Sequence, residues 1–146
     1  MASRDAGPRR ARDATKERHR RVLIEATADA ILDHGLANVS VSRILERAGL
    51  SRGMVNLHFG SKANLLVEVV RHFSEAYGAH WQAAMAAAGP RPDDRLRALI
   101  AADFDDAVLN RRVMAVWTAF RGEAQTSPAY MPFIDSRDAR LQAAFT

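Results

Sequence analysis

The chain has 146 residues, of which 48% are hydrophobic and 26% charged; this is ordinary globular usage and disfavours a disordered or membrane-embedded protein. It contains no cysteine, which excludes disulfides and thiolate metal sites, and no apolar run approaches the roughly 20 residues needed to cross a bilayer, so we expect a cytoplasmic protein. The net charge is only +4, but eight basic residues and three acidic ones lie within the first 21 positions.

The N-terminal residues 1–13 show no apolar periodicity and include Gly7-Pro8, so the sequence predicts a flexible basic arm. A helix is then predicted from Thr15 to His34, ending at Gly35. Its inward face is formed by apolar residues at helical spacing. These are Val22, Leu23, Ala26, Ala30 and Ile31.

Two short helices joined by a tight turn are predicted next. In the first, Ser40 caps the helix, Gly49 ends it, and the inward face is apolar. That face consists of Val41, Ile44, Leu45 and Ala48. Ser51 is expected to cap the second helix, Arg52 to Phe59, which buries Val55 and Phe59. Residues 14–60 therefore predict a helix-turn-helix domain.

The remaining residues, 61–146, predict a helical body. A long helix opens at Gly60-Ser61, with apolar residues at steps of three or four from Leu65 to Ala84, and the segment Gly89 to Pro92 ends it. The inward residues of a fifth helix, which starts at Asp93 or Asp94, are expected to be Leu96, Leu99, Ile100, Phe104, Ala107 and Val108. A sixth helix is expected from about Arg112 to Glu123, and a seventh, after Ser127-Pro128, with Ile134, Leu141 and Phe145 inward. With no strand pattern, the predicted fold class is all-α.

The spacing of three motifs resembles the TetR family of transcriptional regulators. The turn Ala48-Gly49-Leu50-Ser51 is followed by the aromatic pair His58-Phe59 and then by Ser61-Lys62 at the start of a long helix. The body is more weakly similar to the BetI-type branch, through Trp117 to Phe120, Pro128 and Arg140-Leu141. The resemblance implies nine helices with a dimer interface in the last two. Because the chain ends before those two helices, we expect either a truncated body or a different mode of dimerisation.

Four residues of the second short helix are candidates for contact with DNA bases. Asn56 can pair bidentately with adenine, Arg52 can take guanine or a phosphate, Met54 can touch a thymine methyl, and Gly53 would permit close approach. Phosphate contacts are expected from Ser40, Ser42, His58 and Lys62. The alternative is an exposed polar helix without a ligand. Beside this motif, we interpret the basic arm as a further phosphate contact, although basic segments are usually only solvated.

Candidate effector-binding residues are the aromatic side chains Trp81, Phe104, Trp117 and Phe120. Aromatic residues at helical spacing more often belong to the core, and that alternative stays open. The BetI-like resemblance suggests a quaternary ammonium effector, which ring faces would attract, with a carboxylate such as Asp103, Asp105 or Asp106 opposing its charge.

The sequence therefore predicts a ligand-responsive repressor that binds a palindromic operator on double-stranded DNA as a dimer. The alternative is an interaction module, or a truncated regulator, that sequesters a partner without specific DNA binding. An enzyme is disfavoured, because we find no HExxH motif, phosphate-binding glycine loop or nucleophile elbow. We predict no catalytic residues, metal site or cofactor.

Overall fold

The computed structural model describes residues 6–145, apart from the side chains at 6, 137, 138, 141, 144 and 145. Over this range it contains helices and no strand, so the all-α prediction is confirmed. The chain divides between Leu66 and Val67 into two compact units. No helix of the described range is long and apolar enough to span a membrane.

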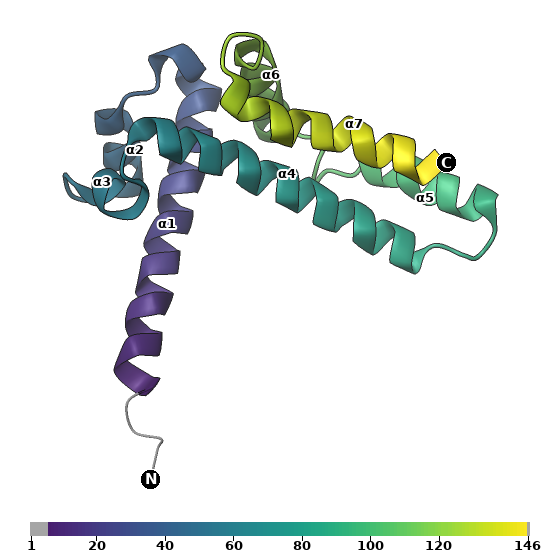
Figure 1. Cartoon of the computed structure of the whole chain (residues 1–146), viewed down its shortest axis with the longest axis horizontal. Coiled ribbons are helices and arrows are strands. Elements are labelled where there is room, and N and C mark those ends of the chain that lie inside the picture. Colours follow the sequence, from purple (N-terminus) through teal and green to yellow (C-terminus); the bar gives the residue numbers. More distant parts are fainter. Residues whose placement is uncertain (1–5, 146) are drawn as a thin grey trace. The chain divides into compact units, whose positions relative to one another are not determined.

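The first unit holds α1 (Ala6–His34), the 3-10 turn η1 (Leu36–Asn38), α2 (Val41–Ala48), α3 (Met54–Phe59) and the start of α4 (Lys62–Ala87). Helices α2 and α3 pack beside the C-terminal half of α1 (Figure 1). Leu23 of α1, Ile44 of α2, Val55 of α3 and Leu65 of α4 are almost completely buried. At about 1.5–3 kcal/mol for each buried aliphatic side chain, these residues form the core that holds the two short helices in place.

Helix α1 begins at Ala6, so the predicted start at Thr15 was wrong, and residues 6–13 are helical instead of a flexible arm. The first five residues of the predicted arm lie outside the described range. Pro8 falls in the first turn, where its missing N–H has no helical partner to lose. The start was missed because the helix is exposed from Gly7 to Arg18 and so has no apolar periodicity to reveal it.

The ends of α2 follow the prediction. The Ser40 hydroxyl accepts a hydrogen bond from the Arg43 amide at 3.2 Å, and Gly49 ends the helix in the left-handed conformation, with φ of 63°. Helix α3, however, begins at Met54, not Arg52, and Ser51 does not cap it through its side chain. Gly53 stands at that end with φ of 87°, a conformation that favours glycine. Arg52 and Gly53 therefore belong to the turn.

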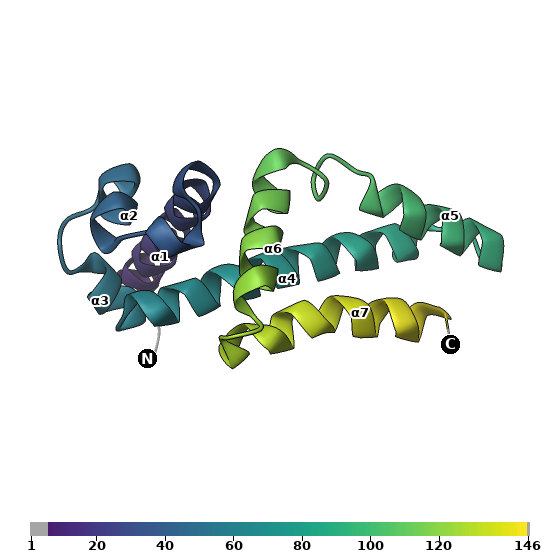
Figure 2. The same cartoon turned by 90° about the horizontal axis from the view of Figure 1, so that it is seen from above.

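The second unit consists of the rest of α4 with α5 (Pro92–Asp103), α6 (Arg111–Glu123), the 3-10 turn η2 (Pro128–Tyr130) and α7 (Met131–Phe145). Figures 1 and 2 show α7 running alongside α4, and in Figure 2 α6 crosses α4 steeply. A hydrogen bond of 3.0 Å joins the hydroxyls of Ser74 and Ser136, on α4 and α7. The core between these helices is apolar. It includes Val69, Val70, Val116, Phe120 and Ile134.

The prediction for the fifth helix needs correction. It ends at Asp103, where the Asp105 carboxylate accepts a hydrogen bond from the Ala107 amide at 2.8 Å and stabilises a turn. Phe104 is consequently 72% exposed, and Leu96 and Ile100 also face outward, leaving Leu99 and Ala102 as the buried residues of α5. Val41 of α2 is exposed as well. Ile134 is buried as predicted, whereas the side chains of Leu141 and Phe145 lie outside the described residues.

Candidate functional site

The outer surface of the helix-turn-helix carries exposed polar side chains and one exposed leucine. Arg52 in the turn and Asn56 on α3 face outward, while Met54 is half-buried. Leu57 is 71% exposed, although Val55 and Phe59 on either side of it are buried. The short helix buries one face on α1 and presents an amide and an alkyl group on the other, and the turn before it presents a guanidinium. Together these groups have the chemistry needed to contact base edges.

Beneath this surface, Arg20 of α1 holds the last turn of α3. Its guanidinium donates a hydrogen bond to the His58 carbonyl and lies over the Phe59 ring, with 4.3 Å from Cζ to the ring centroid. A cation at a helix C-terminus also interacts favourably with the carbonyl groups gathered there. Arg20 therefore fixes the position of α3 on α1.

The His58 side chain turns into the α1–α3 contact. Its ring meets the His19 ring edge-on, with 5.5 Å between centroids, and both ring nitrogens are buried without a hydrogen-bond partner among the described residues. Burial lowers the pKa of His58, and the nearby His19, Arg20 and Lys16 lower it further. His58 was predicted to contact phosphate, but its buried nitrogens do not face the outer surface.

The remaining predicted phosphate contacts surround the start of α2 and of α4. Ser42 is exposed, and Ser40 is exposed but uses its hydroxyl oxygen to cap α2. The Lys62 ammonium donates a hydrogen bond to the Val39 carbonyl at 2.8 Å. Since an ammonium has three N–H groups, Lys62 ties α4 to the chain before α2 and keeps two donors for a phosphate.

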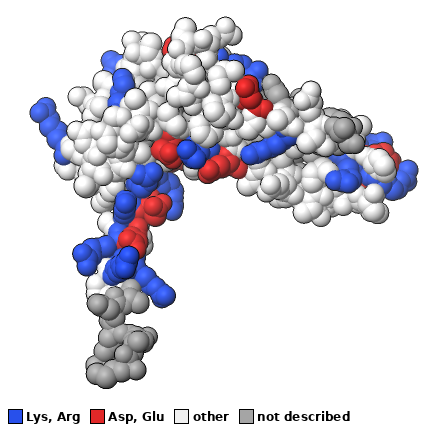
Figure 3. Space-filling view, viewed as in Figure 1, with Lys and Arg blue, Asp and Glu red and all other residues white. Residues whose placement is uncertain are grey.

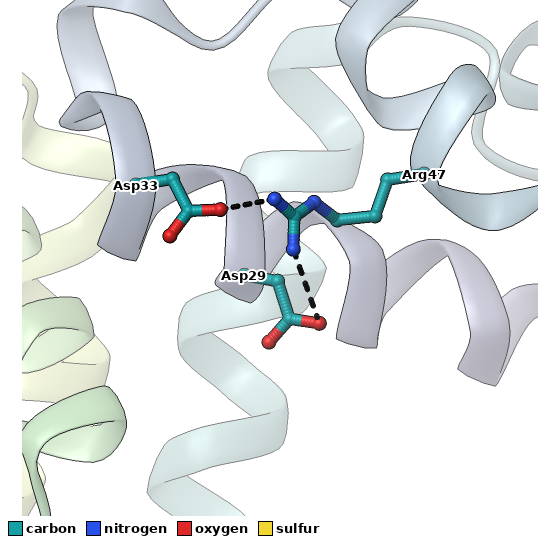
Figure 4. Close-up of polar contacts among 3 residues, drawn as sticks. All are labelled: Asp29, Asp33 and Arg47. Carbon is teal, nitrogen blue, oxygen red and sulfur yellow. Dashed lines mark hydrogen bonds and ion pairs between the residues drawn. The ribbon is translucent and has the colours of Figure 1, made fainter.

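Helix α2 is attached to α1 by the Arg47 side chain. Figure 4 shows its guanidinium between Asp29 and Asp33, which lie one turn apart on α1. The longer of the two ion pairs, to Asp29, measures 3.9 Å. All three side chains are partly exposed, so each pair contributes at most about 1 kcal/mol, but together they restrict rotation of α2 on α1.

In the second unit, one carboxylate lies among aromatic rings. An oxygen of Asp103 accepts hydrogen bonds from the Tyr77 hydroxyl at 2.6 Å and the Trp81 indole at 3.1 Å. The Trp117 ring meets Tyr77 edge-on, with 6.5 Å between centroids. One of the predicted effector residues, Trp81, thus contacts a carboxylate that the sequence had offered as a charge partner, while Trp117 contacts the Tyr77 ring.

The other two predicted effector residues lie elsewhere in the second unit. Phe104 points outward into solvent. Phe120 is completely buried and meets the Tyr130 ring edge-on, with 4.9 Å between centroids. Of the four aromatic candidates, Trp81 and Trp117 share a neighbour, because the Tyr77 ring lies near both.

Comparisons with known proteins agree with this geometry. The family model for bacterial regulatory proteins of the tetR family matches residues 23–69, which contain α2, the turn and α3. A second model, for the C-terminal part of BetI-type transcriptional repressors, matches residues 92–146. The chain belongs to the TetR family. Over the described residues, no cluster of three or more His, Cys, Asp or Glu side chains has the arrangement of a metal site.

Named relatives of this TetR-family chain include BetI regulators. It is 36% identical over 113 residues to the HTH-type transcriptional regulator BetI of Burkholderia thailandensis and of Burkholderia mallei, and covers 58% of each. In both alignments 77% of the chain is matched. The chain thus spans less than two thirds of the length of the BetI proteins it resembles.

Solved structures of similar fold come from two further bacteria. One is described as a transcriptional regulator from Pseudomonas aeruginosa PAO1 and has a TM-score of 0.78 with 28% sequence identity. The match covers 87% of this chain and 61% of that one. Another, from Streptomyces coelicolor A3(2), has a TM-score of 0.75 with 25% identity, and 87% of this chain covers 73% of that one.

Sequence reasoning missed two functional residues of the first unit, which we call the head. Leu57 could have been found, because it lies two positions from both Val55 and Phe59 and so falls on the opposite face of the helix. Arg20 gave no local signal, since the carbonyl it binds is 38 residues further along the chain.

Proposed function

We propose that this chain is a DNA-binding transcriptional regulator whose α3 enters the major groove. The observation that carries the proposal is the two-sided character of α3, which buries Val55 and Phe59 on the head and leaves Asn56 and Leu57 exposed. The matches to tetR-type and BetI-type family models support it. In this proposal the chain acts as a repressor that binds a palindromic operator as a dimer.

The exposed residues divide between base and phosphate contacts. Asn56 would read adenine through a bidentate pair, Leu57 would contact a thymine methyl, and Arg52 in the turn would take guanine or a phosphate. Ser42 and Lys62 would contact phosphates and set the register of α3 on the duplex.

The test begins with duplexes that the wild-type chain selects from a random library. Asn56→Ala should lose about 1–3 kcal/mol for the selected sequence and relax discrimination at one position in each half-site. Gln82→Ala, which removes an exposed amide from the second unit, is the matched control and should bind as the wild type does. A wild-type chain with no preference among duplexes would refute the proposal and favour the partner-sequestering alternative.

Dimerisation is tested separately. The half-sites read by a helix-turn-helix dimer lie about 34 Å apart. Once one head of a dimer is bound to DNA, the other head is held near the second half-site, so its binding needs no second bimolecular association. A palindromic duplex should therefore bind two chains cooperatively in sedimentation experiments, and a duplex with one half-site should bind one chain weakly. Independent binding to the two half-sites would refute the dimeric proposal.

We further infer that the second unit responds to an effector with a quaternary ammonium group. Asp103 provides a partly buried negative charge, Tyr77 and Trp81 bring aromatic rings to it through their hydrogen-bond donors, and Trp117 lies edge-on to Tyr77. One ring over a cation contributes about 0.5–2 kcal/mol. Such a ligand relieves repression only if it binds the arrangement that does not fit DNA more tightly than the one that does.

The effector inference is tested by titrating choline, betaine aldehyde and uncharged apolar compounds while following tryptophan fluorescence and release of DNA. Asp103→Asn keeps an oxygen for the Tyr77 and Trp81 donors but removes the charge, so it should retain the fold and lose the response to choline. Trp117→Leu should also lose the response; a lower melting temperature with an unchanged response would instead assign Trp117 to the core. Release by the uncharged compounds alone would refute a cationic effector.

A further inference from the structure

The N-terminal part of α1, from Gly7 to Arg18, is not buried against any other described element. Every residue from Gly7 to Arg18 is exposed, and in Figure 1 this part of α1 extends beyond α2 and α3. Figure 3 shows Lys and Arg side chains gathered along it, with few acidic ones among them. The helix therefore carries a concentrated positive charge on a segment that the packing of the head does not bury.

Three of these basic residues, Arg9, Arg12 and Lys16, form what we call the α1 stripe. They follow one another at steps of three and four and so share one face of the helix. The next steps along the same face reach His19 and Arg20, which contact the last turn of α3. The stripe is thus continuous with the end of the helix proposed to read DNA.

The electrostatics agree with this continuity. Lys16 is among the charges that lower the pKa of His58, so the inner end of the stripe acts on α3. No hydrogen bond or ion pair joins Arg9, Arg12 or Lys16 to another described residue. Asp13 is four residues from Arg9 and three from Lys16 and so shares this face, which therefore carries three basic side chains and one acidic one from Arg9 to Lys16.

We propose that the α1 stripe binds the phosphate backbone of duplex DNA, next to the segment that α3 reads. This inference rests on the proposed function and extends it, because it adds a sequence-independent contact outside the helix-turn-helix. From Arg9 to Lys16 the helix rises about 10 Å at 1.5 Å per residue, which is roughly a third of a turn of duplex. The stripe therefore has the length to follow the backbone for about three base pairs.

The low intrinsic stability of the helical segment that carries the stripe also favours a nucleic acid as its partner. Like charges three or four residues apart destabilise a helix, and a helical segment that buries no apolar face is marginal in water. Phosphates neutralise these charges and release condensed counterions, so DNA stabilises the helix that presents them. Wild-type chain should accordingly show slower amide exchange between Gly7 and Lys16 when duplex is added.

The experiment compares two triple variants with the same change in charge. The stripe variant is Arg9→Gln, Arg12→Gln and Lys16→Gln; the control is Arg10→Gln, Arg18→Gln and Arg21→Gln, which lie on the opposite face of the same helix. Glutamine is a good helix former, so both variants should keep the helix content of the wild type, measured by circular dichroism. The probes are a duplex selected by the wild-type chain and a random-sequence duplex of equal length.

The stripe variant should reduce the slope of log K against log salt by about 2.7 for each bound chain, since each phosphate that is no longer neutralised lowers it by about 0.9. Its hydroxyl-radical footprint should shorten on one side of each half-site, while the preferred sequence stays the same. The control variant should change the slope by less than about 0.9. Equal reductions in the two variants, or a stripe variant with the wild-type slope and footprint, would overturn the inference.

The inference and the proposed function fail in different ways. A stripe variant that matches the wild type, while Asn56→Ala loses specificity, removes the stripe from the DNA interface and leaves the regulator intact. A wild-type chain that binds neither duplex overturns both.

Discussion

Removing the Arg20 side chain should loosen α3 without unfolding the second unit. Arg20→Ala deletes the hydrogen bond to the His58 carbonyl and the contact with the Phe59 ring. A hydrogen bond to a charged group contributes about 1.5–3 kcal/mol, and a cation–π contact of a partly solvated cation about 0.5–1 kcal/mol. Since the site is partly solvated, we expect a loss of about 2 kcal/mol in the stability of α3 on α1.

Hydrogen exchange measures this loss directly. The Leu57 amide bonds to the Gly53 carbonyl at 2.8 Å and the Gly60 amide to the Asn56 carbonyl at 2.9 Å, so both report on opening of α3. A loss of about 2 kcal/mol corresponds to roughly 30-fold faster exchange where local opening limits it. Arg20→Lys keeps the charge but not the planar donor group, and should show a smaller increase.

Two internal controls accompany the experiment. Arg21→Ala removes an exposed arginine from the next position of α1 and should leave exchange in α3 unchanged. Both tryptophans, Trp81 and Trp117, lie in the second unit, so a fluorescence melt monitors that unit alone. Wild-type exchange at Leu57 and Gly60 in Arg20→Ala would refute the role assigned to Arg20.

Three further predictions concern local features of the first unit. Because the folded head lowers the pKa of His58, the unfolded chain binds the proton more readily. The free energy of unfolding of the head should therefore fall as the pH drops below about 6.5, and His58→Phe should flatten that dependence in denaturation series at several pH values. Gly53→Ala should destabilise the head by about 1 kcal/mol through its positive φ alone, since nothing lies within 4 Å of the added methyl group; chemical denaturation followed by circular dichroism measures it. Ser40→Ala should cost about 1 kcal/mol by removing the cap of α2, which faster exchange of the Arg43 amide would reveal.

The family and the helical fold were accessible from the sequence because their signals are local. Gly35 and Gly49 end helices through their own backbone conformations, and Ser40 caps one through an oxygen three residues from its donor. The apolar spacing of Ile44, Leu45, Val55 and Phe59 likewise follows from helix geometry alone. Such features depend only on neighbours along the chain, so the sequence predicts them in the right places.

The apolar periodicity of the sequence did not predict which face of a helix is buried. In α5 the spacing of Leu96, Ile100 and Phe104 suits an inward face, but the structure buries Leu99 and Ala102 instead. The N-terminal part of α1, from Gly7 to Arg18, shows the opposite case, a helical segment that has no apolar face. An apolar pattern indicates a face that would gain from burial, and only the neighbouring helices decide whether it is buried.

The tertiary structure decided the pairings on which both candidate sites depend. Arg20 reaches a carbonyl 38 residues away, and Asp103 accepts hydrogen bonds from Tyr77 and Trp81, which precede it by 26 and 22 residues. These contacts form because α1 packs against α3 and α5 packs against α4. The paired residues are therefore far apart in the sequence, and no regular spacing predicts them. The sequence by itself determined most of the elements, several of their ends and the family. The packing of those elements determined that His58 turns inward, that Phe104 turns outward, and that a carboxylate lies among aromatic rings.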